Sequence, residues 1–87
     1  MLLQIEDPQS NDLSDSLREA IERDLPGADV AVRIGSPRHY EISVTAAEFQ
    51  GLSKVKQHQR IYAAIGRFMR GNDAPVHAID RLDTRVP

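Results

Sequence analysis

The sequence predicts one small α+β domain in which helices cover a single face of a three-stranded sheet. Two neighbouring segments alternate apolar and polar residues with period two, segments of helical period flank them, and 87 residues leave room for one core. The predicted order is helix, strand, strand, short helix, helix, strand. Because each predicted strand has one apolar face, the helices are expected to gather on that side of the sheet.

The first periodic segment predicts a helix that runs to about Asp24. Residues 1–9 are interpreted as an N-terminal tail, and Asn11 or Asp12 can cap the helix that follows. The apolar positions recur at helical spacing: Leu13, Leu17, Ala20, Ile21 and Leu25. The pair Pro26-Gly27 is expected to end the helix, because proline has no N–H and glycine tolerates a left-handed turn.

Two strands follow, and a third closes the chain. Apolar side chains alternate with polar or small ones over residues 30–34 and again over residues 40–45, and both segments favour β-branched residues. The segment Gly35-Ser36-Pro37-Arg38 is predicted to be the hairpin loop between them. Pro75 restricts the preceding residue to extended geometry, and a third strand is expected from Val76 to Leu82.

A short helix and a long helix are predicted between the second and third strands. Thr45-Ala46-Ala47-Glu48 has the pattern of a capping box for a short helical turn that Gly51 breaks. Ser53 is expected to cap a helix to about Arg70. The apolar arc of that helix would hold Val55, His58, Ile61, Tyr62, Ile65, Phe68 and Met69, and its opposite side Lys56, Arg60, Arg67 and Arg70.

Composition excludes several function classes. There is no cysteine, so the chain itself has no disulfide, thiolate ligand or cysteine nucleophile, although a partner could supply thiolates to a shared metal cluster. No apolar run reaches the about 20 residues that a membrane-spanning helix needs, and no signal peptide is recognised, so a cytoplasmic protein is expected. Neither a nucleophile elbow nor a phosphate-binding glycine loop is present, and the chain is not expected to be an enzyme.

The net charge of −2 hides an asymmetry. Residues 1–29 carry eight acidic and two basic residues, whereas residues 30–87 carry five acidic and nine basic ones. The basic side of the long helix is usually a solvated face, but it could also contact phosphates. Tyr40, Tyr62 and Phe68 are expected in the core, which leaves few aromatic side chains to stack on bases.

Three histidines are the residues that ordinarily titrate near neutral pH. His58 is interpreted as a core histidine with one hydrogen-bonded ring nitrogen. His77 stands at the start of the third strand and His39 closes the hairpin loop, and each alone fits either a surface residue or a ligand. Because zinc takes three or four ligands, often with a close histidine pair, a complete metal site within the chain is not expected.

Taken together, several segments resemble the BolA family. They are Phe49-Gln50-Gly51-Leu52-Ser53-Lys54-Val55, Gln57-His58-Gln59-Arg60-Ile61-Tyr62-Ala63-Ala64, Val76-His77-Ala78-Ile79 and Thr84. The resemblance extends over residues 12–86, so residues 10–87 are identified as a BolA-like domain. It implies a class II KH-like fold of order α-β-β-α-α-β with a three-stranded mixed sheet.

The resemblance also implies a function. A BolA-like chain would be a non-enzymatic adaptor that binds a monothiol glutaredoxin and shares a two-iron two-sulfur (2Fe-2S) cluster with it and glutathione, for iron–sulfur trafficking or iron regulation. The isolated chain, a monomer or weak homodimer, would hold no cluster and bind no membrane. The family's late histidine matches His77, which is expected to be a cluster ligand. Partner docking is expected at Gly51, Leu52, Ser53 and Lys54.

The second ligand is left open by the sequence. The loop between the first two strands has no cysteine, unlike many relatives, so His39 could serve, His77 could act alone, or binding could occur without a bridged cluster. The alternative function is a KH-like nucleic-acid-binding transcriptional regulator that uses Lys54, Lys56, Arg60 and Arg67. Its Gly-x-x-Gly clamp would be Gly51-Leu52-Ser53-Lys54, which lacks the second glycine. A protein-docking module without a metal role is the third possibility.

Overall fold

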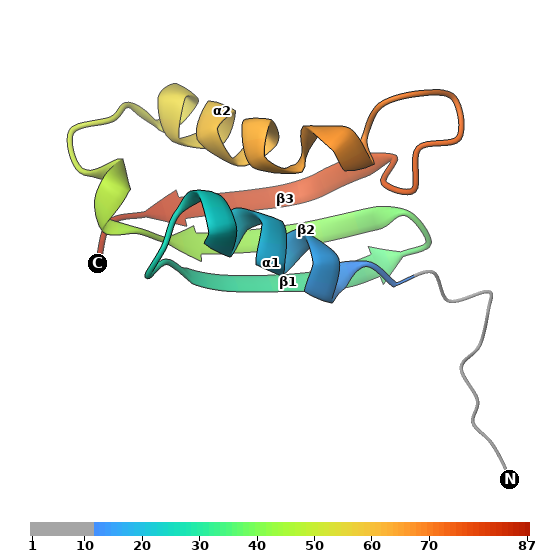
Figure 1. Ribbon diagram of the computed structural model, residues 1–87, viewed down its shortest axis with the longest axis horizontal. Coiled ribbons are helices and arrows are strands. Elements are labelled where there is room, and N and C mark those ends of the chain that lie inside the picture. The colour runs from blue at the N-terminus through green and yellow to red at the C-terminus, as the bar shows by residue number, and fades with distance from the viewer. Residues whose placement is uncertain (1–11) are drawn as a thin grey trace, which may run out of the picture.

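The computed structural model describes residues 12–87, and Figure 1 shows two helices lying over one sheet. The elements in order are α1 (Ser14–Asp24), β1 (Asp29–Ser36), β2 (His39–Thr45), the 3-10 turn η1 (Ala47–Phe49), α2 (Lys54–Ile65), the 3-10 turn η2 (Gly66–Phe68) and β3 (Ala78–Arg85). The predicted tail, residues 1–9, and the candidate cap Asn11 lie outside the described residues. Within residues 12–87, no helix is long and apolar enough to cross a membrane.

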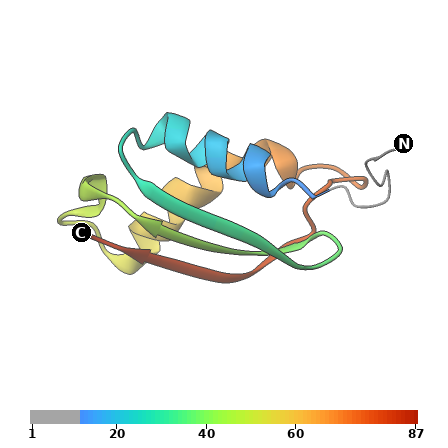
Figure 2. The ribbon, with the colours of Figure 1, turned by 90° about the horizontal axis from the view of Figure 1, so that it is seen from below.

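The sheet is mixed and has the order β1-β2-β3. β1 pairs with β2 in antiparallel fashion, and β2 pairs with β3 in parallel. Figure 2 shows both α-helices on the same side of this sheet. The strand side chains Val30, Tyr40, Ile42 and Val44 are buried against them. The predicted α+β class, the three-stranded mixed sheet and the one-sided cover are therefore present.

The end of α1 follows the predicted local signal, whereas at its start the N-cap residue is Leu13, without a side-chain cap, rather than Asn11 or Asp12. Asp12 Oδ1 accepts hydrogen bonds from the Ser14 backbone N–H at 2.9 Å and from the Ser14 hydroxyl at 2.6 Å, which satisfies one of the free donors at the helix start. Leu17, Ala20 and Ile21 are buried on the inner face of α1. After the helix, Gly27 has φ 87°, the left-handed conformation expected of this position.

The predicted short helix is wrong in type, and the long helix is shorter than predicted. Thr45 is the last residue of β2, and η1 is a single 3-10 turn with no side-chain cap, so the capping box does not form. The cap at Ser53 is confirmed, because its hydroxyl accepts from the Lys56 N–H at 3.2 Å. α2 ends at Ile65 rather than near Arg70, because the chain tightens there into η2.

The predicted apolar arc of α2 is displaced around the helix. The buried positions are Gln57, Ile61, Ala64 and Ile65, which follow the i, i+4, i+7, i+8 spacing of one helical stripe. Tyr62 is 41% exposed and Val55 is 65% exposed, so the predicted core position of Tyr62 is wrong. Tyr40 is fully buried and Phe68 packs partly buried against the core, as predicted.

The third strand begins and ends later than predicted, at Ala78 and Arg85. Val76 is buried, and its N–H donates to the Phe68 carbonyl at 3.0 Å. The His77 N–H donates to the Arg38 carbonyl at 2.8 Å. The two residues before β3 are therefore fixed by the core and by the hairpin, ahead of the regular pairing with β2.

A polar contact inside the core explains why a glutamine occupies the buried stripe of α2. Gln57 Nε2 donates to the Leu52 carbonyl at 2.9 Å, and Gln57 Oε1 accepts from the Thr84 hydroxyl at 2.7 Å. Both side chains are buried, so each polar group needs its partner. The contact joins the start of α2 to the end of β3.

We expect Thr84→Val to lower the free energy of unfolding by about 1–3 kcal/mol, because the buried Gln57 oxygen loses its donor while the side-chain shape is kept. Urea unfolding followed by circular dichroism measures the change. Thr45→Val, on β2 and partly exposed, is the matched control and is expected to stay within about 0.5 kcal/mol of the unmodified protein. Equal losses in the two variants would contradict this account of Gln57.

Candidate metal centre

The candidate site lies where the β1–β2 hairpin meets the beginning of β3. The parallel pairing of β2 with β3 places His39 opposite Ala78. The Arg38 carbonyl accepts from the N–H groups of both His77, at 2.8 Å, and Ala78, at 3.3 Å. As a result, two histidines far apart in the chain come together, with ring centroids 6.5 Å apart and the rings in a T-shaped arrangement. The structure thus brings together the two residues predicted as metal ligands.

His39 is oriented by a carboxylate that the sequence analysis missed. Its Nδ1 lies 3.0 Å from Asp80 Oδ1, and its side chain is 38% exposed. A carboxylate that accepts from Nδ1–H fixes the ring and leaves Nε2 as the nitrogen for a metal. Asp80 follows His77 by three residues, a spacing that could have drawn attention to it. Its contact with His39, however, depends on the β2–β3 pairing.

His77 is exposed and has an arginine as its neighbour. Its Nε2 lies 2.9 Å from Arg38 Nη1. A guanidinium can only donate, so this contact fits the tautomer in which Nε2 accepts and Nδ1 carries the proton. Arg38 occupies the hairpin turn with φ 67°, and it is the one non-glycine residue with positive φ among residues 12–87. The same residue therefore contacts His77 through both its backbone and its side chain.

This arrangement offers two nitrogen donors but not a complete metal site. Two imidazoles from different elements offer neutral nitrogen donors, which iron accepts. Over residues 12–87 no group of three or more histidine and acidic side chains could hold a metal ion. The pair offers two nitrogen donors, which is fewer than the three or four protein ligands of a typical metal site.

The predicted docking turn lies at the other end of the sheet (Figure 1). Gly51, Leu52, Ser53 and Lys54 follow η1, beyond the last residue of β2, whereas His39 is the first residue of that seven-residue strand. The strand spans about 20 Å at the usual rise per residue. The Lys54 ammonium donates to the Thr84 carbonyl near the end of β3. The structure therefore does not bring the docking turn and the histidine pair together.

The four predicted basic residues of the helix do not share one helix face. Lys56 and Arg60 are exposed on α2, where they line a shallow groove with Leu52, Gln59 and Ala63. Arg67 and Arg70 lie beyond the end of α2. The Arg67 guanidinium sits 4.7 Å from the centre of the Phe68 ring, and Arg70 Nε donates to the Gly66 carbonyl at 3.3 Å.

His58 also differs from its prediction. It is partly exposed on α2, and no hydrogen bond to its ring occurs within the described part of the chain. The displaced buried stripe explains this difference, because Gln57 takes the inward position that the arc assigned to His58. His58 therefore lies apart from the pair formed by His39 and His77.

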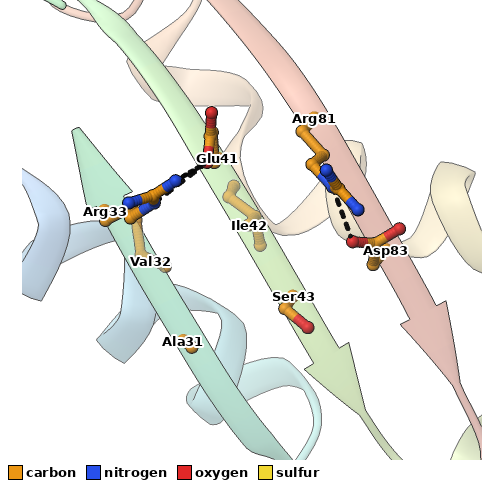
Figure 3. Close-up of a pocket in the computed structure, with 8 residues that line it drawn as sticks. All are labelled: Ala31, Val32, Arg33, Glu41, Ile42, Ser43, Arg81 and Asp83. Carbon is orange, nitrogen blue, oxygen red and sulfur yellow. Dashed lines mark hydrogen bonds and ion pairs between the residues drawn. The ribbon is translucent and has the colours of Figure 1, made fainter. Parts of the chain in front are cut away.

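The sheet face away from the helices is polar and slightly hollowed, with a volume of about 280 Å³ (Figure 3). Arg33 and Glu41 pair across β1 and β2 at 2.7 Å, and Arg81 pairs with Asp83 along β3 at 3.0 Å. The hydrogen bond from Arg81 to Asp83 raises the pKa of Arg81. His39 belongs to the same face, because it alternates with the buried Tyr40. These charges are satisfied within the sheet and leave the histidine pair as the main candidate site.

Comparison with known proteins now identifies the family. The family model described as BolA-like protein matches residues 15–86. The chain belongs to the BolA-like family. It is 37% identical to BolA-like protein 1 of Pongo abelii and 35% identical to BolA-like protein 1 of Homo sapiens, in each case over 57 residues. Each match covers 66% of this chain and 39% of the relative, so this BolA-like chain matches about two fifths of the relatives' length.

Solved structures agree with this assignment. A bolA homologue from Coxiella burnetii has a TM-score of 0.68 and 27% identity, with 85% of this chain and 90% of that chain covered. BolA1 from Arabidopsis thaliana has a TM-score of 0.71 and 18% identity, with 95% of each chain covered. The BolA domain of SufE1 from Arabidopsis thaliana has a TM-score of 0.70 and 20% identity, with 85% and 91% covered. The two Arabidopsis proteins show the shared fold.

Proposed function

We propose that this BolA-like chain is a non-enzymatic adaptor that binds a monothiol glutaredoxin and shares a glutathione-containing 2Fe-2S cluster with it. The juxtaposition of His39 and His77 carries the proposal, because it offers two nitrogen donors where no thiolate of this chain is available. The glutaredoxin and glutathione would supply the thiolates. The class II KH-like assignment of the fold is part of the same proposal.

The ligand chemistry favours transfer over permanent storage. A histidine ligand in place of a thiolate raises the reduction potential of an iron–sulfur cluster. Because a metal-bound imidazole nitrogen must be deprotonated, protons compete with the metal at a histidine ligand, and the bond is sensitive to protonation. A cluster held in part by His77 is therefore easier to hand on.

The geometry restricts how the partner approaches. A glutaredoxin that shares its cluster with His77 has to contact the hairpin end of the sheet, where Arg38 and His39 lie beside the His77 ring and Asp80 contacts His39. The turn at residues 51–54 is about a strand length away, so its participation requires an interface along the whole sheet. Docking at the hairpin end is the simpler arrangement.

Anaerobic cluster reconstitution tests the proposal. A monothiol glutaredoxin and glutathione are reconstituted with and without this chain, and visible absorption, circular dichroism and size-exclusion chromatography are recorded. We expect a new spectrum in a one-to-one complex, because a nitrogen ligand replaces a thiolate. An unchanged spectrum, with no co-elution of this chain and the glutaredoxin, would contradict the proposal for that partner.

The alternative, a nucleic-acid-binding regulator, is favoured by one observation: Lys56 and Arg60 are exposed beside each other on the groove of α2. Lys54 and Arg67 contact other parts of the chain, which leaves two free cations for phosphates among the four predicted. Two phosphate contacts would make the logarithm of the affinity fall by about 1.8 per tenfold rise in salt. Salt-sensitive DNA binding that Lys56→Glu removes, together with no glutaredoxin complex, would favour this alternative.

A further inference from the structure

The Arg38 guanidinium contacts Nε2 of His77, the nitrogen through which this ring would bind a metal. The Nη1–Nε2 distance is 2.9 Å, a hydrogen bond of normal length between a charged donor and a neutral acceptor. A metal that binds through Nε2 has to take the same lone pair. The two events exclude each other, since one lone pair cannot serve the guanidinium and a metal together.

The backbone fixes Arg38 in a position to make this contact. Its carbonyl accepts from the N–H groups of His77 and Ala78, so the hairpin turn is tied to the start of β3. Its φ of 67° is uncommon for a non-glycine residue and belongs to the turn between β1 and β2. Pro75 and the buried Val76 restrict the chain on the other side of His77.

The two histidines consequently differ in whether Nε2 is already engaged in a hydrogen bond. His39 donates through Nδ1–H to Asp80, and its Nε2 makes no hydrogen bond within residues 12–87. His77 offers Nδ1–H to solvent and has Nε2 engaged by arginine. We propose that Arg38 is a displaceable cap on the metal-binding nitrogen of His77, so that a metal binds by exchanging with the guanidinium and the guanidinium returns when the metal leaves.

The inference deepens the proposed function, since it concerns release of the metal from the same site. In the exchange, the hydrogen bond from Nη1 to Nε2 breaks, the Nε2 lone pair binds the metal, and the Nδ1 proton stays in place. No oxidant, reductant or leaving proton is required. A cap of this kind lowers the net affinity of His77 for metal and speeds its return to the free state.

Arg38→Asn removes the cap with the least disturbance of the turn. Asparagine adopts positive φ more readily than other non-glycine residues, and its carbonyl still accepts from His77 and Ala78. Its short side chain cannot reproduce the guanidinium contact with Nε2. Amide proton–nitrogen spectra report whether the fold of the variant is intact.

The first measurement is the tautomer of His77, read from long-range proton–nitrogen correlation of the imidazole rings. We expect the Nδ1–H form in the unmodified chain and a shift toward the Nε2–H form, the usual preference of a free ring, in Arg38→Asn. His39 is the internal reference, because its bond to Asp80 should keep Nδ1–H in both proteins. An Nε2–H form of His77 in the unmodified chain would overturn the proposal.

The second measurement is Zn²⁺ binding to the isolated chain, followed by the same ring signals. We expect Arg38→Asn to bind Zn²⁺ about three- to tenfold more tightly, the range for one lost competing hydrogen bond. Titration in about 0.5 M salt screens the separate effect of removing a positive charge. Equal Zn²⁺ affinities at that salt concentration would show that Arg38 does not compete. Neither measurement needs a glutaredoxin, so failure of the adaptor proposal and failure of the cap are distinguishable.

Discussion

Phe49→Ala is expected to remove a large part of the free energy of unfolding of this protein. The Phe49 side chain is fully buried in the core. Truncation of such a phenylalanine costs about 3–5 kcal/mol through lost burial and the cavity that remains. A domain of this length has a total stability of about 4–13 kcal/mol. Urea and thermal unfolding followed by circular dichroism measure the loss.

The position of Phe49 makes this loss hard to compensate. It stands in η1, a single turn without a side-chain cap, between β2 and α2. The local backbone bonds are few, chiefly from the Phe49 N–H to Ala46 at 3.1 Å and from the Leu52 N–H to the Phe49 carbonyl at 3.0 Å. Burial of the Phe49 ring, more than local hydrogen bonding, therefore holds this segment against the core.

Phe68→Ala is the matched control for this prediction. Phe68 also stands in a 3-10 turn, η2, but its ring is only partly buried and packs on the edge of the core. We expect a clearly smaller loss of stability than for Phe49→Ala, because less apolar surface returns to water. Equal losses, or a loss below about 1 kcal/mol for Phe49→Ala, would contradict the assignment of Phe49 to the centre of the core.

The elements that could be predicted from the sequence are those with strong local signals. Alternation at Val30, Val32 and Ile34 specifies which face of β1 is buried, because the side-chain period of a strand is two. Pro26-Gly27 and Ser53 act through their own backbone and hydroxyl chemistry. The conformation of such elements is therefore determined mostly by residues close to them in the sequence.

The buried face of α2 was not predicted correctly because contacts with residues outside the helix determine it. Apolar spacing alone favours an arc through Tyr62, and Gln57 looks like a surface residue. In the folded chain, Gln57 is buried because Thr84 and Leu52 satisfy its amide, and both partners lie outside the helix. No pattern within residues 54–65 contains that information, so the buried stripe was assigned about one position too far along.

The candidate metal site could likewise be predicted only in part. His77 could be selected from the family resemblance, and His39 from its place at the end of the hairpin loop. Their contacts with Arg38 and Asp80 could not be predicted, because both cross between the hairpin and β3. Those contacts exist only once the crossover through α2 has placed β3 parallel to β2.

His77→Ala is expected to have the largest effect on the proposed shared cluster. Loss of partners that merely orient a metal ligand typically lowers metal affinity about 10- to 100-fold, and loss of a ligand should cost at least as much. The fold should persist, because His77 is exposed and an alanine N–H still donates to the Arg38 carbonyl. Reconstitution with a monothiol glutaredoxin, followed by visible circular dichroism, measures the loss. His58→Ala is the matched control, since that histidine is on α2 and away from the hairpin end. If the spectrum of the mixed complex is unchanged in His77→Ala, His77 is not a ligand.

His39→Ala then tests whether His39 is the second ligand of the proposed shared cluster. If both imidazoles bind the shared cluster, His39→Ala reproduces the spectral loss of His77→Ala, and Asp80→Asn produces a smaller loss by freeing the ring that Asp80 orients. We expect this result, because the centroid of the His39 ring lies 6.5 Å from that of His77 and the bond to Asp80 engages Nδ1 rather than Nε2. A spectrum unchanged in His39→Ala and Asp80→Asn but lost in His77→Ala would instead assign the nitrogen ligation to His77 alone.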